Sequence, residues 1–246
     1  MKEFFIDDHG TRLHAKLELP QGKEKCPLIL IVHGITGHME ERHIKAAAEA
    51  ALDMGIAALR VEMYGHGMSD GQFEDHTLFR WISNILAVAD YAASLDFVTD
   101  LFITGHSQGG LLSIIAAGMR PDMFKALIPL SPALSIPDQA RKGLFLGLKM
   151  DPVNLPDEFI FKDKKLRGDC VAVAQMIYAE DLIRKYTGPV LLIHGDEDER
   201  VPVEYSIKAN ELYKNSRLVI IRGDNHGYDH HLDQVLDAYK KFLGEF

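Results

Sequence analysis

The sequence has few cysteines and no long apolar run. Its only two cysteines, Cys26 and Cys170, lie far apart and have no neighbours at metal-ligand spacing, so neither a disulfide framework nor a thiolate metal site is expected. No apolar stretch approaches the roughly 20 residues that a membrane-spanning helix needs. Acidic side chains stand within residues 1–8, where a secretory signal would be apolar. These absences predict a cytoplasmic protein with no membrane partner.

The chain also lacks an excess of positive charge. Its 27 Lys and Arg residues are outnumbered by 36 Asp and Glu residues, which gives a formal net charge of −9. Binding to nucleic-acid phosphates needs clustered Lys and Arg, and no such stripe occurs. The sequence therefore predicts no nucleic-acid partner and favours a small neutral or cationic substrate.

Short apolar runs alternate with longer helical patterns along most of the chain. The apolar runs predict strands at 28–32, 57–62, 101–104, 126–130, 190–194 and 218–221, and the segments between them predict helices near 40–54, 77–95, 110–119, 203–213 and 229–243. Continuous apolar strands linked by helices are typical of a parallel sheet that is covered on both faces. Segments 3–7 and 11–19 predict an antiparallel hairpin at one edge. We expect an α/β fold with a mostly parallel sheet of about eight strands.

One interval breaks this alternation. From 132 to 187 the pattern is irregular, and four prolines punctuate it. We interpret this interval as an insertion within a single domain of residues 1–246, a size that one α/β domain commonly reaches. The second half of the insertion predicts a small hairpin at 158–167 and a helix at 171–178.

The pattern G-x-S-x-G occurs twice, around Ser69 and around Ser107. A predicted strand runs directly into Gly105 and a helix of small apolar residues follows Gly109, which is the context of a nucleophile on a sharp strand-to-helix turn. The glycines are required because larger side chains two residues from the serine would collide. Ser69 lies several loop residues after its strand, and no buried helix follows it. The sequence predicts Ser107 as nucleophile and Ser69 as a turn serine.

A serine hydroxyl needs an imidazole to accept its proton, and the imidazole needs a carboxylate on its other nitrogen. The predicted strand 190–194 ends in a turn in which Asp198 is the preferred orienting carboxylate. Asp196 is interpreted as a residue that caps the turn. His226 stands in the polar loop after the last predicted strand, where a general base is expected.

Two backbone N–H groups are expected to bind the negative oxygen of the tetrahedral intermediate. One belongs to Gln108, directly after the nucleophile, and the other is expected from the glycine-containing loop 33–37, with Ile35 as the donor. No metal or cofactor is expected, because His230 and His231 fit an exposed turn beside His226 and no carboxylate-rich ligand motif surrounds the three histidines.

Taken in order, these motifs resemble those of the α/β-hydrolase superfamily over nearly the whole chain. They are His33-Gly34, 65–71, 105–110, 195–202 and Asp224-Asn225-His226. Within the superfamily, the segments 33–37 and 105–110 and the medium-sized insertion resemble those of bacterial feruloyl (cinnamoyl) esterases, although those enzymes more often carry Phe at the position of Ile35.

The resemblance implies a role for the insertion. In those esterases it forms a small α/β cap that lines the acyl pocket and contacts the ring hydroxyl of the hydroxycinnamoyl group. By place in the chain, this implicates Asp138 and Gln139 as polar contacts, with Phe145, Met176 and Tyr178 as pocket walls.

The leading hypothesis is hydrolysis of a small-molecule carboxylic ester, of the aryl or hydroxycinnamoyl kind, through an acyl-enzyme. A monoacylglycerol lipase, a thioesterase and a peptidase share the same catalytic residues and differ in pocket shape. A non-catalytic ligand receptor is a further alternative, which a complete Ser-Asp-His set disfavours. The sequence fixes neither the acyl group, nor the alcohol, nor the oligomeric state, for which a homodimer is one alternative.

Overall fold

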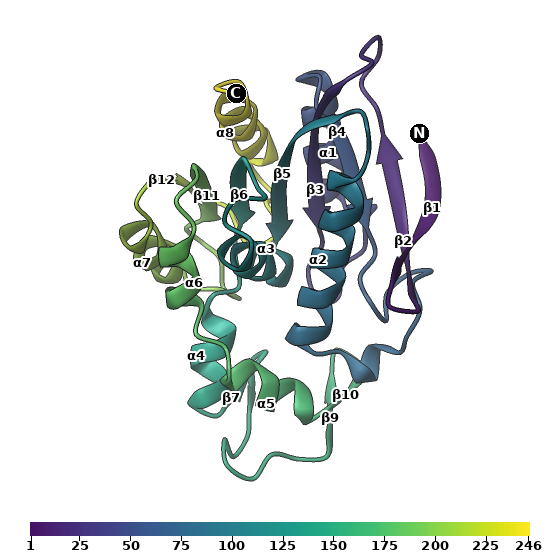
Figure 1. The fold of residues 1–246 in the computed structure, drawn as a ribbon. Helices are drawn as coiled ribbons and strands as arrows, with labels where there is room; N and C mark the ends of the chain where they lie inside the picture. Colours follow the sequence, from purple (N-terminus) through teal and green to yellow (C-terminus); the bar gives the residue numbers. More distant parts are fainter.

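The structure, a computed structural model, describes residues 1–246 and contains one twisted eight-stranded sheet (Figure 1). The strand order is β1-β2-β4-β3-β5-β6-β11-β12. The strands are β1 (Lys2–Asp8), β2 (Thr11–Glu18), β3 (Cys26–Val32), β4 (Ala57–Val61), β5 (Val98–His106), β6 (Ala126–Leu130), β11 (Val190–Gly195) and β12 (Ser216–Ile221). β1 pairs antiparallel with β2 and β2 with β4, while all other pairs are parallel. The predicted fold class and the edge hairpin are confirmed.

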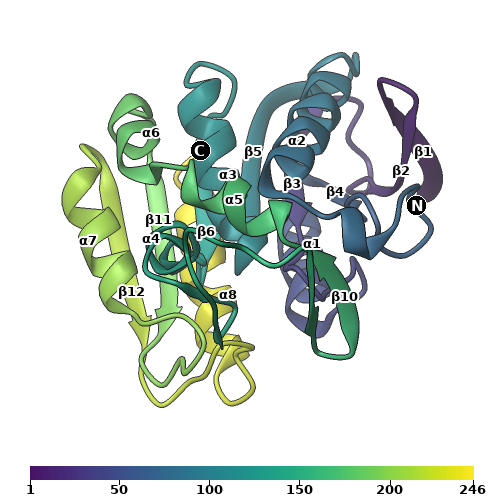
Figure 2. The same cartoon turned by 90° about the horizontal axis from the view of Figure 1, so that it is seen from below.

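Helices cover both faces of the sheet, as Figure 2 shows in a view from below. On one face pack α1 (Arg42–Asp53) and α8 (Leu232–Leu243), and on the other α2 (Leu78–Ala93), α3 (Gln108–Met119), α6 (Ala179–Lys185) and α7 (Glu204–Leu212). Neighbouring residues of β3 serve opposite cores, because successive side chains of a strand point to opposite faces. None of the helices combines the length and apolar character that crossing a bilayer requires.

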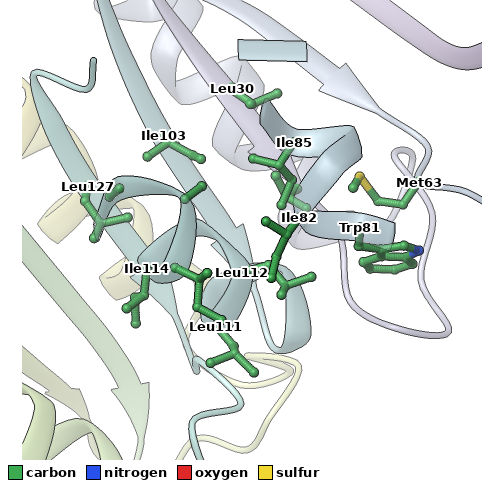
Figure 3. Close-up of a cluster of buried hydrophobic side chains, with 14 of the residues drawn as sticks. Leu30, Met63, Trp81, Ile82, Ile85, Ile103, Leu111, Leu112, Ile114 and Leu127 are labelled. Atoms are coloured by element: carbon green, nitrogen blue, oxygen red, sulfur yellow. The ribbon is translucent and has the colours of Figure 1, made fainter. Parts of the chain in front are cut away.

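The larger core holds the helix that follows Ser107. Leu111, Leu112 and Ile114 of α3 pack in the same cluster as strand residues such as Leu30 and Ile103 (Figure 3). Residues 108–118 of α3 are all buried, so the helix is enclosed on every side. Burying one such aliphatic side chain contributes about 1.5–3 kcal/mol, which makes α3 a rigid base for the turn at its start.

The insertion lies between β6 and β11, beyond the ends of the central strands (Figure 1). It contains α4 (Ser135–Arg141), β7 (Leu144–Phe145), β8 (Leu148–Lys149), β9 (Glu158–Phe161), β10 (Lys164–Arg167), α5 (Asp169–Gln175) and α6. The hairpin predicted at 158–167 is β9–β10, and the helix predicted at 171–178 is α5. Ion pairs join the hairpin to the short helix η1 (Phe73–Asp75): Lys165 lies 2.8 Å from Glu74 and Arg167 lies 3.1 Å from Asp75.

Candidate active site

Ser107 stands on the turn between β5 and α3. Its backbone has φ 57° and ψ −120°, a region that a residue with a side chain rarely adopts. A Cβ on Gly105 would lie 2.4 Å from the carbonyl oxygen of Gly109, and a Cβ on Gly109 would lie 2.4 Å from that of Val32. Both contacts are too close to be accommodated without movement of the backbone. The two glycines therefore permit the sharp turn, for the reason inferred from the sequence.

The structure brings Ser107, His226 and Asp198 into one hydrogen-bonded chain. The Ser107 hydroxyl lies 2.8 Å from His226 Nε2, and His226 Nδ1 lies 2.6 Å from Asp198 Oδ2. Asp198 follows β11 and His226 lies between β12 and α8, so three strand ends of the sheet converge here. With Nδ1 donating to the carboxylate, Nε2 is left to accept the serine proton.

Asp198 is held as a carboxylate by donors on both of its oxygens. Oδ1 accepts the backbone N–H groups of Arg200 and Val201, each at 2.9 Å. Burial alone would raise the pKa of Asp198, but hydrogen bonds from His194 and His226 outweigh burial and lower its pKa below the ordinary carboxyl range. The lowered pKa favours the ionised form of Asp198 beside the imidazole.

Asp196 occupies a different position in the same turn. Its side chain is exposed, and Oδ1 accepts the backbone N–H of Gly223 at 2.7 Å. The contact ties the loop after β11 to the loop after β12, and it lies apart from the hydrogen bonds of His226. Asp196 is thus placed as a loop-fixing residue.

The two residues expected to supply oxyanion donors, Gln108 and Ile35, belong to segments that adjoin Ser107. Gln108 is the first residue of α3, where the N–H has no acceptor within its own helix. Gly34 packs directly on Ser107, since a Cβ on Gly34 would lie 3.2 Å from that of Ser107, and the following residue, Ile35, lines the same cavity as Ser107. Burial lowers the pKa of His33 to about 3, which keeps this ring neutral. His33 Nδ1 then donates to the carbonyl of Gly34 at 2.7 Å and fixes the peptide that carries the Ile35 N–H.

A cavity of about 310 Å³ opens above Ser107. The loop after β3 and the two loops that bear Asp198 and His226 form one side, and the insertion forms the other. The insertion contributes Ala133, Ser135, Ile136, Gln139, Leu146, Gly147, Phe161 and Lys162 to the lining. The lining combines apolar side chains with polar and charged ones, among them Glu41, Lys162 and Arg200. Of the five substrate contacts implied by the resemblance, only Gln139 lines this cavity.

The placement of Asp138 differs from the expectation. Its side chain accepts hydrogen bonds from the hydroxyl of Tyr205 and from Lys142, each at 2.8 Å, and it lines a separate cavity of about 190 Å³ between α4, α6 and α7. Successive residues of a helix point about 100° apart, and Asp138 and Gln139 of α4 accordingly line different cavities. Asp138 does not line the cavity above Ser107, so the structure gives no support to its expected contact with the acyl group.

The three expected wall residues also lie outside the cavity above Ser107. Phe145 is buried in the core against Phe159, with ring centroids 6.0 Å apart, and its neighbour Leu146 lines the cavity instead. Met176 is exposed at the end of α5, and Tyr178 is exposed and stacks under the guanidinium of Arg141. Place in the chain did not indicate which side of each short insertion element turns inward.

Ser69, in the second G-x-S-x-G, is engaged in local structure. Its hydroxyl donates to the carbonyl of Glu62 at 2.6 Å and accepts the backbone N–H of His14 at 2.8 Å. These bonds join the loop after β4 to the neighbouring strand β2. The hydrogen bonds of the Ser69 hydroxyl go to backbone groups and to no imidazole, in keeping with the interpretation as a turn serine.

Sequence reasoning missed two histidines that contact the site. His194, the penultimate residue of β11, is fully buried, and its Nε2 lies 3.1 Å from Asp198 Oδ2. His106, next to Ser107, directs Nε2 to the carbonyl of His226 at 2.7 Å, and burial lowers its pKa, so the neutral ring holds the base loop. The available signal was a polar residue at the end of an otherwise apolar strand, because a buried polar group needs a partner.

Comparisons with known proteins place this geometry in context. Residues 43–244 match the model of the prolyl oligopeptidase family. The solved structure of Est1E from Butyrivibrio proteoclasticus with ferulic acid bound is similar at 56% identity, covering 98% of each chain with a TM-score of 0.97. The mitochondrial palmitoyl-protein thioesterase ABHD10 of Homo sapiens is 25% identical over 87% of this chain and 70% of its own length. The monoglyceride lipase of Homo sapiens is 25% identical over 95% of this chain and 86% of its own length.

Proposed function

This chain belongs to the prolyl oligopeptidase family, and from that membership and the hydrogen-bonded chain at Ser107 we propose that it cleaves hydroxycinnamoyl esters through an acyl-enzyme. It is a serine hydrolase of carboxylic esters. In the proposed assignment Ser107 is the nucleophile, His226 the general base and Asp198 the orienting carboxylate. The observation that carries the proposal is the pair of contacts of His226, 2.8 Å to Ser107 Oγ and 2.6 Å to Asp198 Oδ2, beneath a cavity of about 310 Å³.

In the acylation step, Ser107 Oγ attacks the ester carbonyl carbon while its proton passes to His226 Nε2. The imidazolium that forms is stabilised by the ionised Asp198. The carbonyl oxygen becomes an oxyanion and receives hydrogen bonds from the backbone N–H groups of Gln108 and Ile35. Removal of one such donor in a serine hydrolase typically costs about 10²–10³ in kcat, so the rigidity of these two peptides is part of the proposed chemistry.

The intermediate collapses when the carbonyl re-forms and the bond to the alcohol oxygen breaks. His226 Nε2 gives its proton to the departing alcohol, so the alcohol leaves on the His226 side of Ser107. A water molecule then loses a proton to His226, attacks the acyl carbon and releases the acid, and Ser107 recovers its proton. All proton transfers use one imidazole, and the residues described require no cofactor for them.

The proposed acyl group is a hydroxycinnamoyl group. The support is the lining of the cavity by insertion residues and the 56% identity to Est1E, whose structure holds ferulic acid. Ile136, Leu146 and Phe161 supply apolar surface for an aromatic ring, and the amide of Gln139 supplies a polar contact within the same wall. In this proposal the insertion 132–187 acts as a cap on a single domain.

A panel of four substrates tests the proposal: methyl ferulate, a palmitoyl thioester, a monoacylglycerol and a prolyl peptide anilide. The expected order places methyl ferulate first in kcat/KM, with loss of all activity in Ser107→Ala. Preference for the thioester or the monoacylglycerol would replace the hydroxycinnamoyl assignment while the serine mechanism stands. Preference for the anilide would favour the peptidase alternative.

Two further predictions from the sequence remain as proposals. We retain a cytoplasmic location, for which immunolocalisation in the source cell is the test. We also retain a homodimer as the proposed oligomeric state, and light scattering coupled to size-exclusion chromatography measures it directly; a mass near 27.6 kDa would identify a monomer instead.

A further inference from the structure

Asp198 binds two histidines through the same carboxylate oxygen. Oδ2 lies 2.6 Å from His226 Nδ1 and 3.1 Å from His194 Nε2. The side chains of Asp198 and His194 are both fully buried, whereas the side chain of His226 retains 8% exposure towards the cavity. The catalytic assignment uses only His226, so the second histidine is a buried titratable group whose position calls for a physical account.

The surroundings of His194 determine which of its nitrogens carries the proton. Nε2 faces two acceptors, Asp198 Oδ2 at 3.1 Å and the carbonyl of Val201 at 3.0 Å, so it must bear a hydrogen. Nδ1 lies 2.7 Å from the hydroxyl of Ser206 in α7, which is itself fully buried and can donate to it. His194 is thereby fixed in orientation from α7 and presents an N–H to Asp198.

This N–H completes the set of donors around the carboxylate. The backbone N–H groups of Arg200 and Val201 hold Oδ1, and without His194 the other oxygen would have His226 as its sole hydrogen-bond partner. His226 exchanges protons with Ser107 in the proposed reaction, so its charge changes during each catalytic cycle, whereas a donor outside the proton transfers keeps the same hydrogen bond to the carboxylate throughout. His194 is the one donor on Oδ2 that takes no part in the reaction and contacts no part of the cavity.

We propose that His194 is a positioning residue of the catalytic machinery, which holds Asp198 Oδ2 in line with His226 Nδ1 through an N–H that Ser206 orients from α7. The inference rests on the proposed triad and extends it to a chain of five side chains, Ser206, His194, Asp198, His226 and Ser107. Because His194 touches neither substrate nor Ser107, its effect falls on proton transfer and leaves substrate binding unchanged.

Two substitutions at position 194 test the proposal. His194→Leu removes the N–H at similar volume and should lower kcat by roughly ten- to a hundredfold with KM within twofold, since a hydrogen bond to a charged group is lost. His194→Gln places an amide N–H as many bonds from the backbone as Nε2, and it should restore most of that loss. An unchanged kcat in His194→Leu, or equal losses in Leu and Gln variants, would overturn the proposal.

A matched control separates positioning from general damage to the core. His14 is also a buried histidine that contacts a carboxylate, Glu62 at 3.2 Å, but it lies on β2, next to the edge strand β1 and far along the sheet from β11. His14→Leu should keep the wild-type kcat per active site, counted by the end point of fluorophosphonate titration. If His14→Leu lowered kcat per site as much as His194→Leu, a specific role for His194 would be excluded.

A spectroscopic readout makes the inference independent of turnover. The proton between His226 and Asp198 should give a low-field ¹H NMR signal because the contact is short, 2.6 Å. The signal should shift or broaden in His194→Leu and persist in His194→Gln and His14→Leu. A wild type that hydrolyses no ester but shows this pattern would overturn the proposed function and keep the positioning role. An unaltered signal in His194→Leu together with normal ester turnover would overturn the positioning role and keep the proposed function.

Discussion

At the scale of single residues, the conformation of Ser107 links the fold to the chemistry. A backbone at φ 57° and ψ −120° is held only when the surrounding structure enforces it. Here the enforcement comes from the buried α3 and from the backbone N–H of Ser107, which donates to the carbonyl of Leu130 at 2.9 Å. This backbone conformation directs the Ser107 hydroxyl away from the end of the sheet and towards His226.

Ser107→Ala should therefore abolish hydrolysis of p-nitrophenyl esters, with a loss on the order of a millionfold if it behaves as other triad serines do. Ser69→Ala is the matched change in the other G-x-S-x-G. It should keep most turnover and lower the free energy of unfolding by about 1–3 kcal/mol, because two buried hydrogen bonds are lost. Labelling of Ser69 by a fluorophosphonate probe, located by mass spectrometry, would contradict the assignment.

The pair Asp196 and Asp198 offers an equally direct comparison. Asp198→Asn should lower kcat by about 10⁴, because the amide can present an N–H to His226 and stabilise the wrong tautomer. Asp196→Asn should lower kcat little, since Asp196 is exposed and bonds only the backbone of Gly223. Steady-state kinetics of both variants on one p-nitrophenyl ester decide the matter, and similar losses would reopen the choice between the two carboxylates.

A site residue could be predicted from the sequence when its position relative to an apolar strand run indicated its role. Ser107, Asp198 and His226 stand at the ends of strands, and strand ends can be located from apolar runs alone. His194 also ends such a run, but a single histidine there is as compatible with a core residue as with a site residue. Its contact with Asp198 depends on the curl of the turn that follows β11, which no local pattern specifies.

At the scale of elements, the insertion shows where sequence pattern loses predictive power. The hairpin β9–β10 and the helix α5 were predictable, because their residues alternate or repeat over several positions. The sequence did not predict which side of each element faces the cavity. α4 and α5 have 7 residues each and β7 has 2, which is too few for a periodic pattern to define a face. Phe145 was expected at the cavity, but the structure places its neighbour Leu146 there.

The orientation of α4, which directs Gln139 to the cavity above Ser107 and Asp138 to the separate cavity, yields a prediction for these two residues. Gln139→Leu should lower kcat/KM for methyl ferulate by roughly two- to tenfold, since a neutral hydrogen bond contributes about 0.5–1.5 kcal/mol. The same change should have less effect on phenyl propionate, because the acyl part of this ester has no aromatic ring. Asp138→Ala is the control, because Asp138 faces the separate cavity beside Tyr205 and Lys142. A larger loss of ferulate activity in Asp138→Ala than in Gln139→Leu would contradict the geometry described here.

At the scale of the whole molecule, the sequence predicted most of the architecture. It did not predict which histidines are buried. Eight strands, their parallel pairing and the antiparallel edge follow from apolar runs and linking helices. The chain has 12 histidines, and the structure buries eight of them: His14, His33, His43, His66, His76, His106, His194 and His226. Burial of so many imidazoles ties the stability of the fold to pH.

Three of these histidines define the expected pH range. Burial is the main cause that lowers the pKa from the ordinary value of 6.5 to about 3 for His33, to about 3 for His76 and to about 4 for His43. Below pH 6.5 the unfolded chain takes up protons that the folded chain refuses, so the folded state loses stability as the pH falls from 6.5 towards 4. At pH 5 each such group costs on the order of 2 kcal/mol, against a total of about 5–15 kcal/mol for a typical domain.

Urea unfolding followed by the fluorescence of the single tryptophan, the buried Trp81, should therefore show similar midpoints at pH 8 and pH 7 and a much lower midpoint at pH 5. His43→Leu isolates one contribution, because Nε2 of His43 is buried without a hydrogen-bond partner and its removal breaks no bond. This variant should reduce the difference in unfolding free energy between pH 7 and pH 5 by about 2 kcal/mol. Equal midpoints for the wild type at pH 7 and pH 5 would show that the buried imidazoles take up protons without opposing the fold, contrary to the burial that lowers their pKa values.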